Sequence, residues 1–212
     1  MEESILRSVS SQLNLFLRLC AAALLACAAH GAVAATQATL RFESLNKSHG
    51  LPSENALAMV GQATFLESLA GYVSGADILA HCPNLHSPLI YSQWLHQPSM
   101  SMWLAEVQPG GAPVGYLVMG PANEDDPRGA VRIRRVYLLH RFQGMKIGRR
   151  LMDAALAQAR RHEACRAVLH VYIKNLAGLA FYHRYGFSIA GARNYRVNGV
   201  DYDNHVMALQ LR

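Results

Sequence analysis

Gln143-Gly144-Met145-Lys146-Ile147-Gly148-Arg149 is the stretch of the chain that decides the predicted fold. It lies between an apolar run at 136–139 and a helical pattern at 151–161, which predicts a tight loop between a strand and a helix. Glycine lets the backbone turn sharply, and the first amides of a helix have no acceptor within the helix. With its basic side chains, the loop suits an anion such as a pyrophosphate. The alternative is an ordinary connection that happens to contain two glycines.

A second stretch makes this interpretation specific. Asn175-Leu176-Ala177-Gly178-Leu179-Ala180-Phe181-Tyr182, followed by Tyr185-Gly186-Phe187, resembles a signature of the GCN5-related N-acetyltransferase (GNAT) family, Asn-x-x-Ala-x-x-Phe-Tyr and then Gly-Phe. The first stretch then resembles the acetyl-coenzyme A loop of that family, Gln/Arg-x-x-Gly-x-Gly/Ala, through Gln143, Lys146 and Gly148. The two motifs occur in the order and at the spacing of the family. The similarity runs from about Thr39 to Arg212.

Two residues depart from the family pattern. Lys146 stands where the family usually has its middle glycine, and Gly178 stands where it usually has alanine. A lysine at the first position is expected to adopt a backbone conformation that accommodates a Cβ atom. Its ammonium group is expected to add a contact to phosphate, so we interpret Lys146 as a tolerated variant.

The resemblance implies a set of coenzyme-binding residues. In the family, the strand before the loop splays at a bulge, its backbone amides hold the pantetheine arm and the thioester oxygen, and the loop wraps the pyrophosphate. The motif asparagine contacts the coenzyme from the start of its helix, although a plain helix cap is the alternative here. The implied residues are Val136, Tyr137, Leu138, Gln143, Gly144, Met145, Lys146, Ile147, Gly148, Arg149 and Asn175.

The resemblance also implies two catalytic residues. Tyr182 occupies the position of the tyrosine whose hydroxyl protonates the departing thiolate, and a free tyrosine, with a pKa of about 10, carries that proton at neutral pH. A packed aromatic residue is the alternative. His170 matches the position of a glutamate that serves several members as a base, and histidine can accept a proton near neutral pH. A structural histidine, Tyr172, Glu106 or a chain of water molecules are the alternatives.

Composition agrees with one enzyme domain. The chain has 212 residues, of which 51% are apolar, and a formal charge of +6. The basic residues between 132 and 161 are predicted to cluster around the loop, where an anionic coenzyme explains them, and no nucleic-acid-binding motif occurs. Cys82 and Cys165 lie far apart in sequence and show no metal-ligand spacing. We therefore expect no metal, no nucleic acid and no covalent acyl-enzyme.

Residues 1–38 are predicted to be an N-terminal extension. An alanine-rich apolar run at 19–29 follows Arg18 and precedes Ala32-Val33-Ala34, a pattern found at signal-peptide cleavage sites. Glu2, Glu3 and the length of the stretch before the run argue against export. Three interpretations stay open: a start placed too far upstream or a disordered extension, a signal peptide, and a helix that lies on or anchors to a membrane.

The remaining chain, residues 39–212, is predicted to form one domain of the α/β class, of α+β type. Its single central sheet is expected to be mixed and mostly antiparallel, with a splayed strand pair at the coenzyme site and helices on both faces. Leu66 is expected on the apolar face of a long helix after Pro52, and Pro83 is expected to separate two short helices. Strands are predicted at 40–43, 102–107, 114–119, 130–138, 167–173, 188–197 and 205–211, and further helices at 76–80, 89–94, 148–162 and 176–184.

The predicted function is direct transfer of an acetyl group from acetyl-coenzyme A to a primary amine of a small molecule or protein. A coenzyme-binding sensor that has lost turnover is the alternative. The acceptor stays open, because the first half of the domain varies freely within the family. We expect a cytoplasmic protein, or an exported one if residues 1–34 are a signal peptide, and a homodimer is possible.

Overall fold

The strands and helices of this chain follow from its apolar residues, which recur at every second position in strands and at every third or fourth position in helices. The computed structural model describes residues 39–45, 53–197 and 200–212, and the described part from Thr39 onward forms one unit. The elements in chain order are β1 Thr39–Ser44, α2 Ser53–Leu69, α3 Gly75–Leu85, α4 Pro88–Leu95, β2 Ser101–Gln108, β3 Ala112–Pro121, β4 Ala130–Leu138, the 3₁₀ turn η1 His140–Phe142, α5 Ile147–Arg161, β5 Arg166–Tyr172, α6 Leu176–Arg184, β6 Ser188–Val197 and β7 Val200–Gln210.

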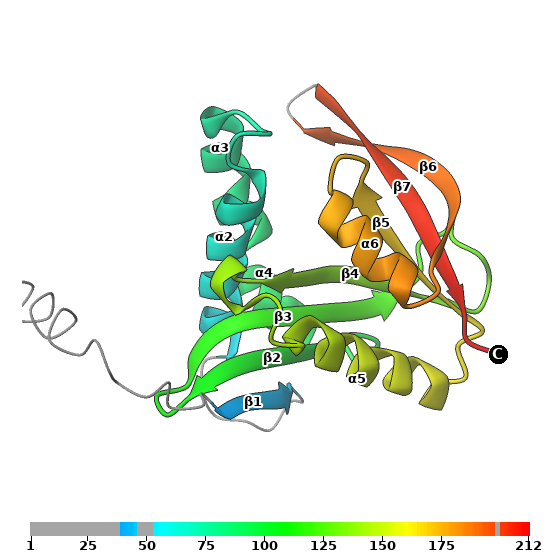
Figure 1. Ribbon diagram of the computed structural model, residues 1–212, viewed down its shortest axis with the longest axis horizontal. Helices are drawn as coiled ribbons and strands as arrows, with labels where there is room; N and C mark the ends of the chain where they lie inside the picture. The colour runs from blue at the N-terminus through cyan, green and yellow to red at the C-terminus, as the bar shows by residue number, and fades with distance from the viewer. Residues whose placement is uncertain (1–38, 46–52, 198–199) are drawn as a thin grey trace, which may run out of the picture. The chain divides into compact units, whose positions relative to one another are not determined.

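One seven-stranded sheet organises the domain, with the strand order β1-β2-β3-β4-β5-β7-β6. Only β4 and β5 run parallel; the other neighbours are antiparallel. The parallel pair is short, because residues 130–133 of β4 pair with residues 166–169 of β5 and the two strands then separate. Figure 1 shows this divergence, with β5, β7 and β6 turned away from the remaining strands. The predicted mixed sheet with a splayed pair is confirmed.

The sheet is covered on both faces. On β3, Leu117 and Met119 enter a core that α5 and α6 cover, whereas Tyr116 and Val118 enter a second core that α2 and α4 cover. This alternation follows from the two-residue period of a strand. Because both cores meet at the central strands, the end of β4 is packed on both faces where the loop at 143–149 begins. Among the described residues, no helix is both long and apolar enough to cross a membrane.

Some local predictions were wrong. Pro83 lies inside α3 and does not end it, and Pro88 is at the first turn of α4, where its missing N–H costs nothing. Leu66 is 53% exposed, and Thr64 is buried instead. Thr64 tolerates burial because its hydroxyl donates a 2.6 Å hydrogen bond to the carbonyl oxygen of Val60. The last strand begins at Val200 and not at 205. The predictions for residues 1–38 lie outside the described residues.

Candidate active site

The splay leaves one edge of β4 without a strand partner. The register between β3 and β4 shifts at Arg134, so that Val118 faces Arg135 and Met119 faces Ile133. Beyond this bulge, residues 136–138 stay paired with β3 on one side only, because β5 has already diverged. A strand edge of this kind presents backbone N–H and C=O groups that can bind an extended ligand. Val136, Tyr137 and Leu138 therefore lie where the sequence predicted them, at an open edge.

The side chains at the end of β4 alternate between the two cores. Val136 and Leu138 pack against the core below α5, and Tyr137 points to the other face. There its ring stacks on Tyr116, with 5.9 Å between ring centroids and 22° between the planes. This packing fixes the backbone of residues 136–138 from both sides of the sheet.

The loop after β4 has the conformation that an anion site needs. Gly144 has a φ of 81°, and Lys146, the N-cap of α5, has a φ of 62°. The expectation that Lys146 adopts a backbone conformation that accommodates a Cβ atom was wrong, since its backbone lies in the left-handed region that favours glycine. No side chain caps the helix, so the amides of its first turn lack side-chain acceptors in the described structure. Ile147 is fully buried and anchors the turn.

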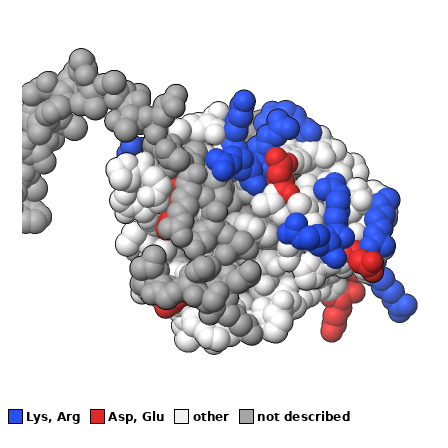
Figure 2. Space-filling model, turned by 90° about the horizontal axis from the view of Figure 1, so that it is seen from below, with Lys and Arg blue, Asp and Glu red and all other residues white. Residues whose placement is uncertain are grey.

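Basic side chains surround this helix but only part of the predicted cluster is there. Figure 2 shows Lys and Arg side chains gathered on one half of the described surface, with few acidic side chains among them. Exposed arginines lie at both ends of α5, Arg149 and Arg150 at its start and Arg160 and Arg161 at its end. Arg149 forms an exposed ion pair of 3.7 Å with Asp153, which leaves its guanidinium close to the first turn.

The arginines of β4 do not extend to the loop. Arg132 contacts His170, and Arg134 donates a 2.9 Å hydrogen bond to the carbonyl oxygen of Pro121. Arg135 donates 2.7 Å hydrogen bonds to the carbonyl oxygen of Leu85 and the hydroxyl of Tyr91. Sequence reasoning missed these roles because the partners are separated by 13 to 50 residues.

Arg135 belongs to a buried polar cluster that sequence reasoning did not find. His86 is 2% exposed and its Nδ1 lies 2.9 Å from the Tyr91 hydroxyl, which donates to the hydroxyl of Tyr116 at 3.0 Å. Burial and the charge of Arg135 lower the pKa of His86 to about 3. The cluster joins α3 and α4 to β3 and β4, beneath the stacked ring of Tyr137.

Asn175 caps α6, the helix that carries the second motif. Its side-chain Oδ1 accepts a 2.9 Å hydrogen bond from the backbone N–H of Gly178. A Cβ atom on Gly178 would come within 2.7 Å of the Asn175 amide nitrogen. Gly178 therefore allows the asparagine to fold back over the first turn. The predicted cap is present, and coenzyme contact by Asn175 stays a prediction.

Tyr182 lies on α6 with its ring packed against two phenylalanines. The ring centroids of Phe181 and Phe187 are 5.4 and 5.9 Å from that of Tyr182. Burial, with a smaller contribution from Tyr137, raises the pKa of the Tyr182 phenol. No described residue forms a hydrogen bond with its hydroxyl. Tyr182 is thus a protonated phenol near the strand residue Tyr137, and its packing role is compatible with proton donation.

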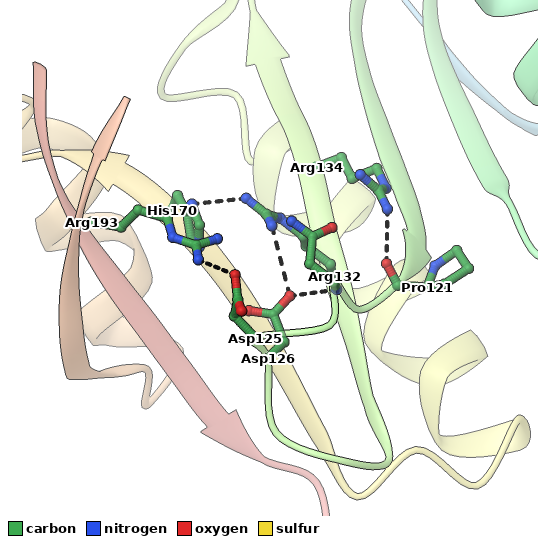
Figure 3. Close-up of polar contacts among 8 residues, drawn as sticks. Pro121, Asp125, Asp126, Arg132, Arg134, His170 and Arg193 are labelled. Carbon is green, nitrogen blue, oxygen red and sulfur yellow. Dashed lines mark hydrogen bonds and ion pairs between the residues drawn. The ribbon is translucent and has the colours of Figure 1, made fainter. Parts of the chain in front are cut away.

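His170 occupies the fork of the splay. It is the first residue of β5 beyond the last pair, Ile133 with Leu169. Its Nδ1 lies 2.8 Å from the Nη2 of Arg132, and Arg132 also faces Asp126 at 3.7 Å, as Figure 3 shows. Burial and the charge of Arg132 lower the pKa of His170 to about 4. Because Nδ1 already accepts from arginine, this geometry favours a role other than the predicted base.

A cavity of about 270 Å³ opens beside His170, between β5, β6, β7 and the loop that joins β3 to β4. Its lining combines small residues with charged and polar side chains. An ion pair between two lining residues, Asp125 and Arg193, links the loop to β6. The residues that line the cavity are Asp125, Asp126, Pro127, Val168, His170, Ala190, Gly191, Ala192, Arg193, Val206 and Ala208.

The other candidates are dispersed. Tyr172 packs edge-on against Tyr202, with ring centroids 6.0 Å apart, and Glu106 lies on β2, two strands from β4. Cys82 is buried and Cys165 is exposed, and both are free thiols. Within the described ranges, no group of three or more His, Cys, Asp or Glu side chains could hold a metal ion.

Comparison with known proteins agrees with this geometry. The model of the acetyltransferase (GNAT) family matches residues 68–187, which is more than half of the chain. Uncharacterised N-acetyltransferases of Mycobacterium bovis and Mycobacterium tuberculosis are 28% identical over 155 residues, covering 73% of this chain and 96% of the relative.

Solved structures share the fold. The PaiA N-acetyltransferase of Thermoplasma acidophilum, in complex with coenzyme A, superimposes with a TM-score of 0.65 at 16% identity, over 81% of this chain and 99% of that one. A protein of Salmonella typhimurium solved with its cofactor acetyl-CoA gives a TM-score of 0.58 at 22% identity, over 84% and 95% of the two chains.

Proposed function

Because this chain belongs to the GNAT family of acetyltransferases and is an acyltransferase, we propose that it transfers the acetyl group of acetyl-coenzyme A directly to a primary amine. One observation carries the proposal. The end of β4 combines an edge that lacks β5 as a partner, a left-handed loop that follows it, and the protonated phenol of Tyr182 near Tyr137. A thioester carrier needs these three features: a phosphate site, a strand edge for its arm, and an acid for its sulfur.

The proposed coenzyme site uses backbone groups. The pantetheine arm lies along residues 136–138, and the pyrophosphate lies on the first turn of α5 with residues 143–149 around it. Support comes from the uncapped amides of that turn and from Gly144, where a Cβ atom would meet no other residue within 4 Å. A helix N-terminus of this kind favours an anion. Asn175 contributes from the start of α6.

In the proposed reaction the amine nitrogen attacks the thioester carbon and a tetrahedral intermediate forms. Its carbon–sulfur bond then breaks, and Tyr182 gives its proton to the departing thiolate. The tyrosinate regains a proton that the amine releases through solvent. A raised pKa keeps the phenol protonated at neutral pH, so that a proton is available when charge develops on sulfur. The amine is proposed to lose its proton to water, so no side-chain base is required. This agrees with His170, whose Nδ1 lone pair is already bound to Arg132.

The acceptor is proposed to be a small molecule or a protein amine in the cytoplasm, and a homodimer is compatible with this activity.

A coenzyme-binding sensor without turnover is the second candidate. One observation favours the sensor: the Nδ1 lone pair of His170, the predicted base, is already bound to Arg132 in the described structure. Tyr182 argues for turnover, since binding alone does not require an acid at the sulfur.

The decisive test measures thiol release from acetyl-coenzyme A with a panel of amines, alongside calorimetry with coenzyme A. Binding together with amine-dependent thiol release is the expected result. Tight binding without acetylation of any amine favours the sensor, and no binding heat at saturating coenzyme overturns both.

A further inference from the structure

Three residues from separate elements form a chain of polar contacts that ends at the cavity. Asp126, in the loop after β3, has a side chain 5% exposed, and its Oδ2 accepts a 2.8 Å hydrogen bond from the N–H of Asn123. The same oxygen lies 3.7 Å from Nη1 of Arg132. Arg132 in turn donates from Nη2 to Nδ1 of His170 at 2.8 Å. Figure 3 shows the three side chains in sequence across β4 and β5.

This chain of contacts determines the tautomer of His170. A guanidinium has donors only and stays protonated, so Nδ1 of His170 must be the acceptor. A neutral imidazole whose Nδ1 accepts carries its proton on Nε2. Arg132 binds Nδ1 of the ring, and His170 lines the cavity. Nε2–H is therefore the polar group of the ring that can donate a hydrogen bond to a ligand in the cavity.

Burial is the main factor that opposes protonation of the ring, and the charges of Arg132 and Arg193 add to it against the charge of Asp126. Arg132 on β4 and Arg193 on β6 are cations, and Asp125 and Asp126 in the loop after β3 pair with them. The facing cavity residues of β7, Val206 and Ala208, carry no charge. The pKa of His170 is lowered to about 4, so the ring is neutral at pH 7.

We propose that Asp126 and Arg132 are positioning residues that hold His170 as an Nε2–H donor, and that this donor binds a carbonyl or carboxylate oxygen of the acceptor. The inference rests on the proposed acetyl transfer and names its substrate class: amines that carry such an oxygen, as amino acids and their amides do. Plain alkylamines and polyamines lack it.

Position and charge support this class. His170 stands at the fork where β4 and β5 separate, so a group bound there adjoins the proposed thioester site. A donor cannot accept a hydrogen bond from an ammonium group, which disfavours a second amine at this point. Of the two donors in this chain of contacts, Arg132 and His170, His170 is the one that lines the cavity, whereas Nη1 of Arg132 faces Asp126. The cavity of about 270 Å³ is large enough to hold the rest of a small amino acid.

The tautomer is tested by NMR of protein labelled with 15N at histidine, with the His170 signals assigned from a His170→Gln variant. The Nε2–H pattern, unchanged from pH 8 to pH 5.5, is expected. In Arg132→Gln the pKa of His170 is expected to rise but to stay below the ordinary value of about 6.5, because the ring remains buried. Asp126→Asn, which keeps Arg132, provides a second and milder variant. A wild-type ring with its proton on Nδ1, or one that titrates above pH 6, overturns the proposal.

The substrate class is tested with matched acceptors, glycine against methylamine and alanine against ethylamine. The oxygen-bearing member of each pair is expected to have at least a tenfold higher kcat/KM. His170→Ala should reduce that advantage about tenfold, as expected for one hydrogen bond to a charged group, whereas His170→Gln, which retains an N–H donor, should largely preserve it. Equal rates within each pair overturn the proposal.

Failure of this inference and failure of the proposed function give different results. Glycine added without acetyl-coenzyme A is expected to shift the Nε2 signal of His170, and this readout needs no turnover. A shift without acetylation supports the oxygen site and contradicts acetyl transfer to these amines. Acetylation with no shift and no preference contradicts the oxygen site alone.

Discussion

Gly115 on β3 lies directly opposite Leu138 on β4, and a Cβ atom on Gly115 would come within 2.7 Å of Leu138 Cδ1 and 2.9 Å of the carbonyl oxygen of Tyr137. Gly115→Ala therefore has to displace the end of β4, where the coenzyme arm is proposed to bind. We expect a loss of about 2 kcal/mol in the free energy of unfolding, typical of overpacking, and weaker coenzyme binding. Urea denaturation and calorimetry measure the two effects.

Gly75→Ala is the matched control. Gly75 begins α3, and its added methyl group would meet no other residue within 4 Å. Alanine in a helix is favoured over glycine by up to about 1 kcal/mol, so this variant should be as stable as the wild type or more so. Equal behaviour of the two variants would contradict the steric account of Gly115.

Lys146 combines a strained backbone with a useful charge, and two substitutions separate them. Lys146→Gly should raise the free energy of unfolding by about 1 kcal/mol, because glycine adopts a φ of 62° without the Cβ penalty. Lys146→Ala keeps the strain and should leave stability nearly unchanged. Both remove the ammonium group and should weaken coenzyme binding equally. Thermal or urea denaturation that shows the same gain for both variants would refute the backbone explanation.

Tyr182→Phe tests the proposed acid. Loss of the hydroxyl should lower kcat by at least about 100-fold, within the range for general acid catalysis, with little change in coenzyme affinity. Stability should change by less than about 1 kcal/mol, because no described residue loses a hydrogen-bond partner. Steady-state kinetics, calorimetry and urea denaturation provide the three values. A variant that retains a third of the wild-type kcat would exclude Tyr182 as the acid.

Two neutral histidines should make the protein sensitive to acid. The pKa values of His86 and His170 are lowered to about 3 and about 4, whereas an unfolded histidine has a pKa of about 6.5. Below pH 6.5 the unfolded chain thus binds more protons than the folded one. Stability is fully present above pH 6.5 and declines as the pH falls toward 4, by about 1.4 kcal/mol per pH unit for each histidine.

Urea denaturation between pH 7.5 and 4.5 measures this decline. In His170→Gln the slope between pH 6 and pH 4.5 should be smaller by about 1.4 kcal/mol per pH unit, since one titrating group is gone. Identical slopes in the two proteins would show that His170 titrates equally in its folded and unfolded states.

The sequence predicted most elements because strands and helices have local periods. The bounds of β4, α6 and β6 agree with those predicted, since each has a clear alternation, cap or motif. Pro83 was misread because a proline can also stand within a helix when tertiary packing holds it there. The loop at residue 146 was found by its glycines, although its left-handed lysine was not anticipated.

The side chains of the site were harder to predict. The destinations of Arg132 and Arg135 depend on Asp126, His170 and Leu85, which only the fold brings near them. A bulge at Arg134 also shifts the alternation of β4, so the two-residue period predicts the wrong face of the sheet for side chains beyond Ile133. Long-range pairing of this kind leaves no local trace in the sequence.

The cap of α6 has a consequence for how the coenzyme could be recognised. With its Oδ1 held by the N–H of Gly178, the side-chain amide of Asn175 has a fixed orientation over the first turn of the helix. Capping uses the acceptor atom of this amide, Oδ1, and leaves its donor group, Nδ2–H, for a ligand. If Asn175 contacts the coenzyme as proposed, its fixed amide lowers the entropic cost of binding.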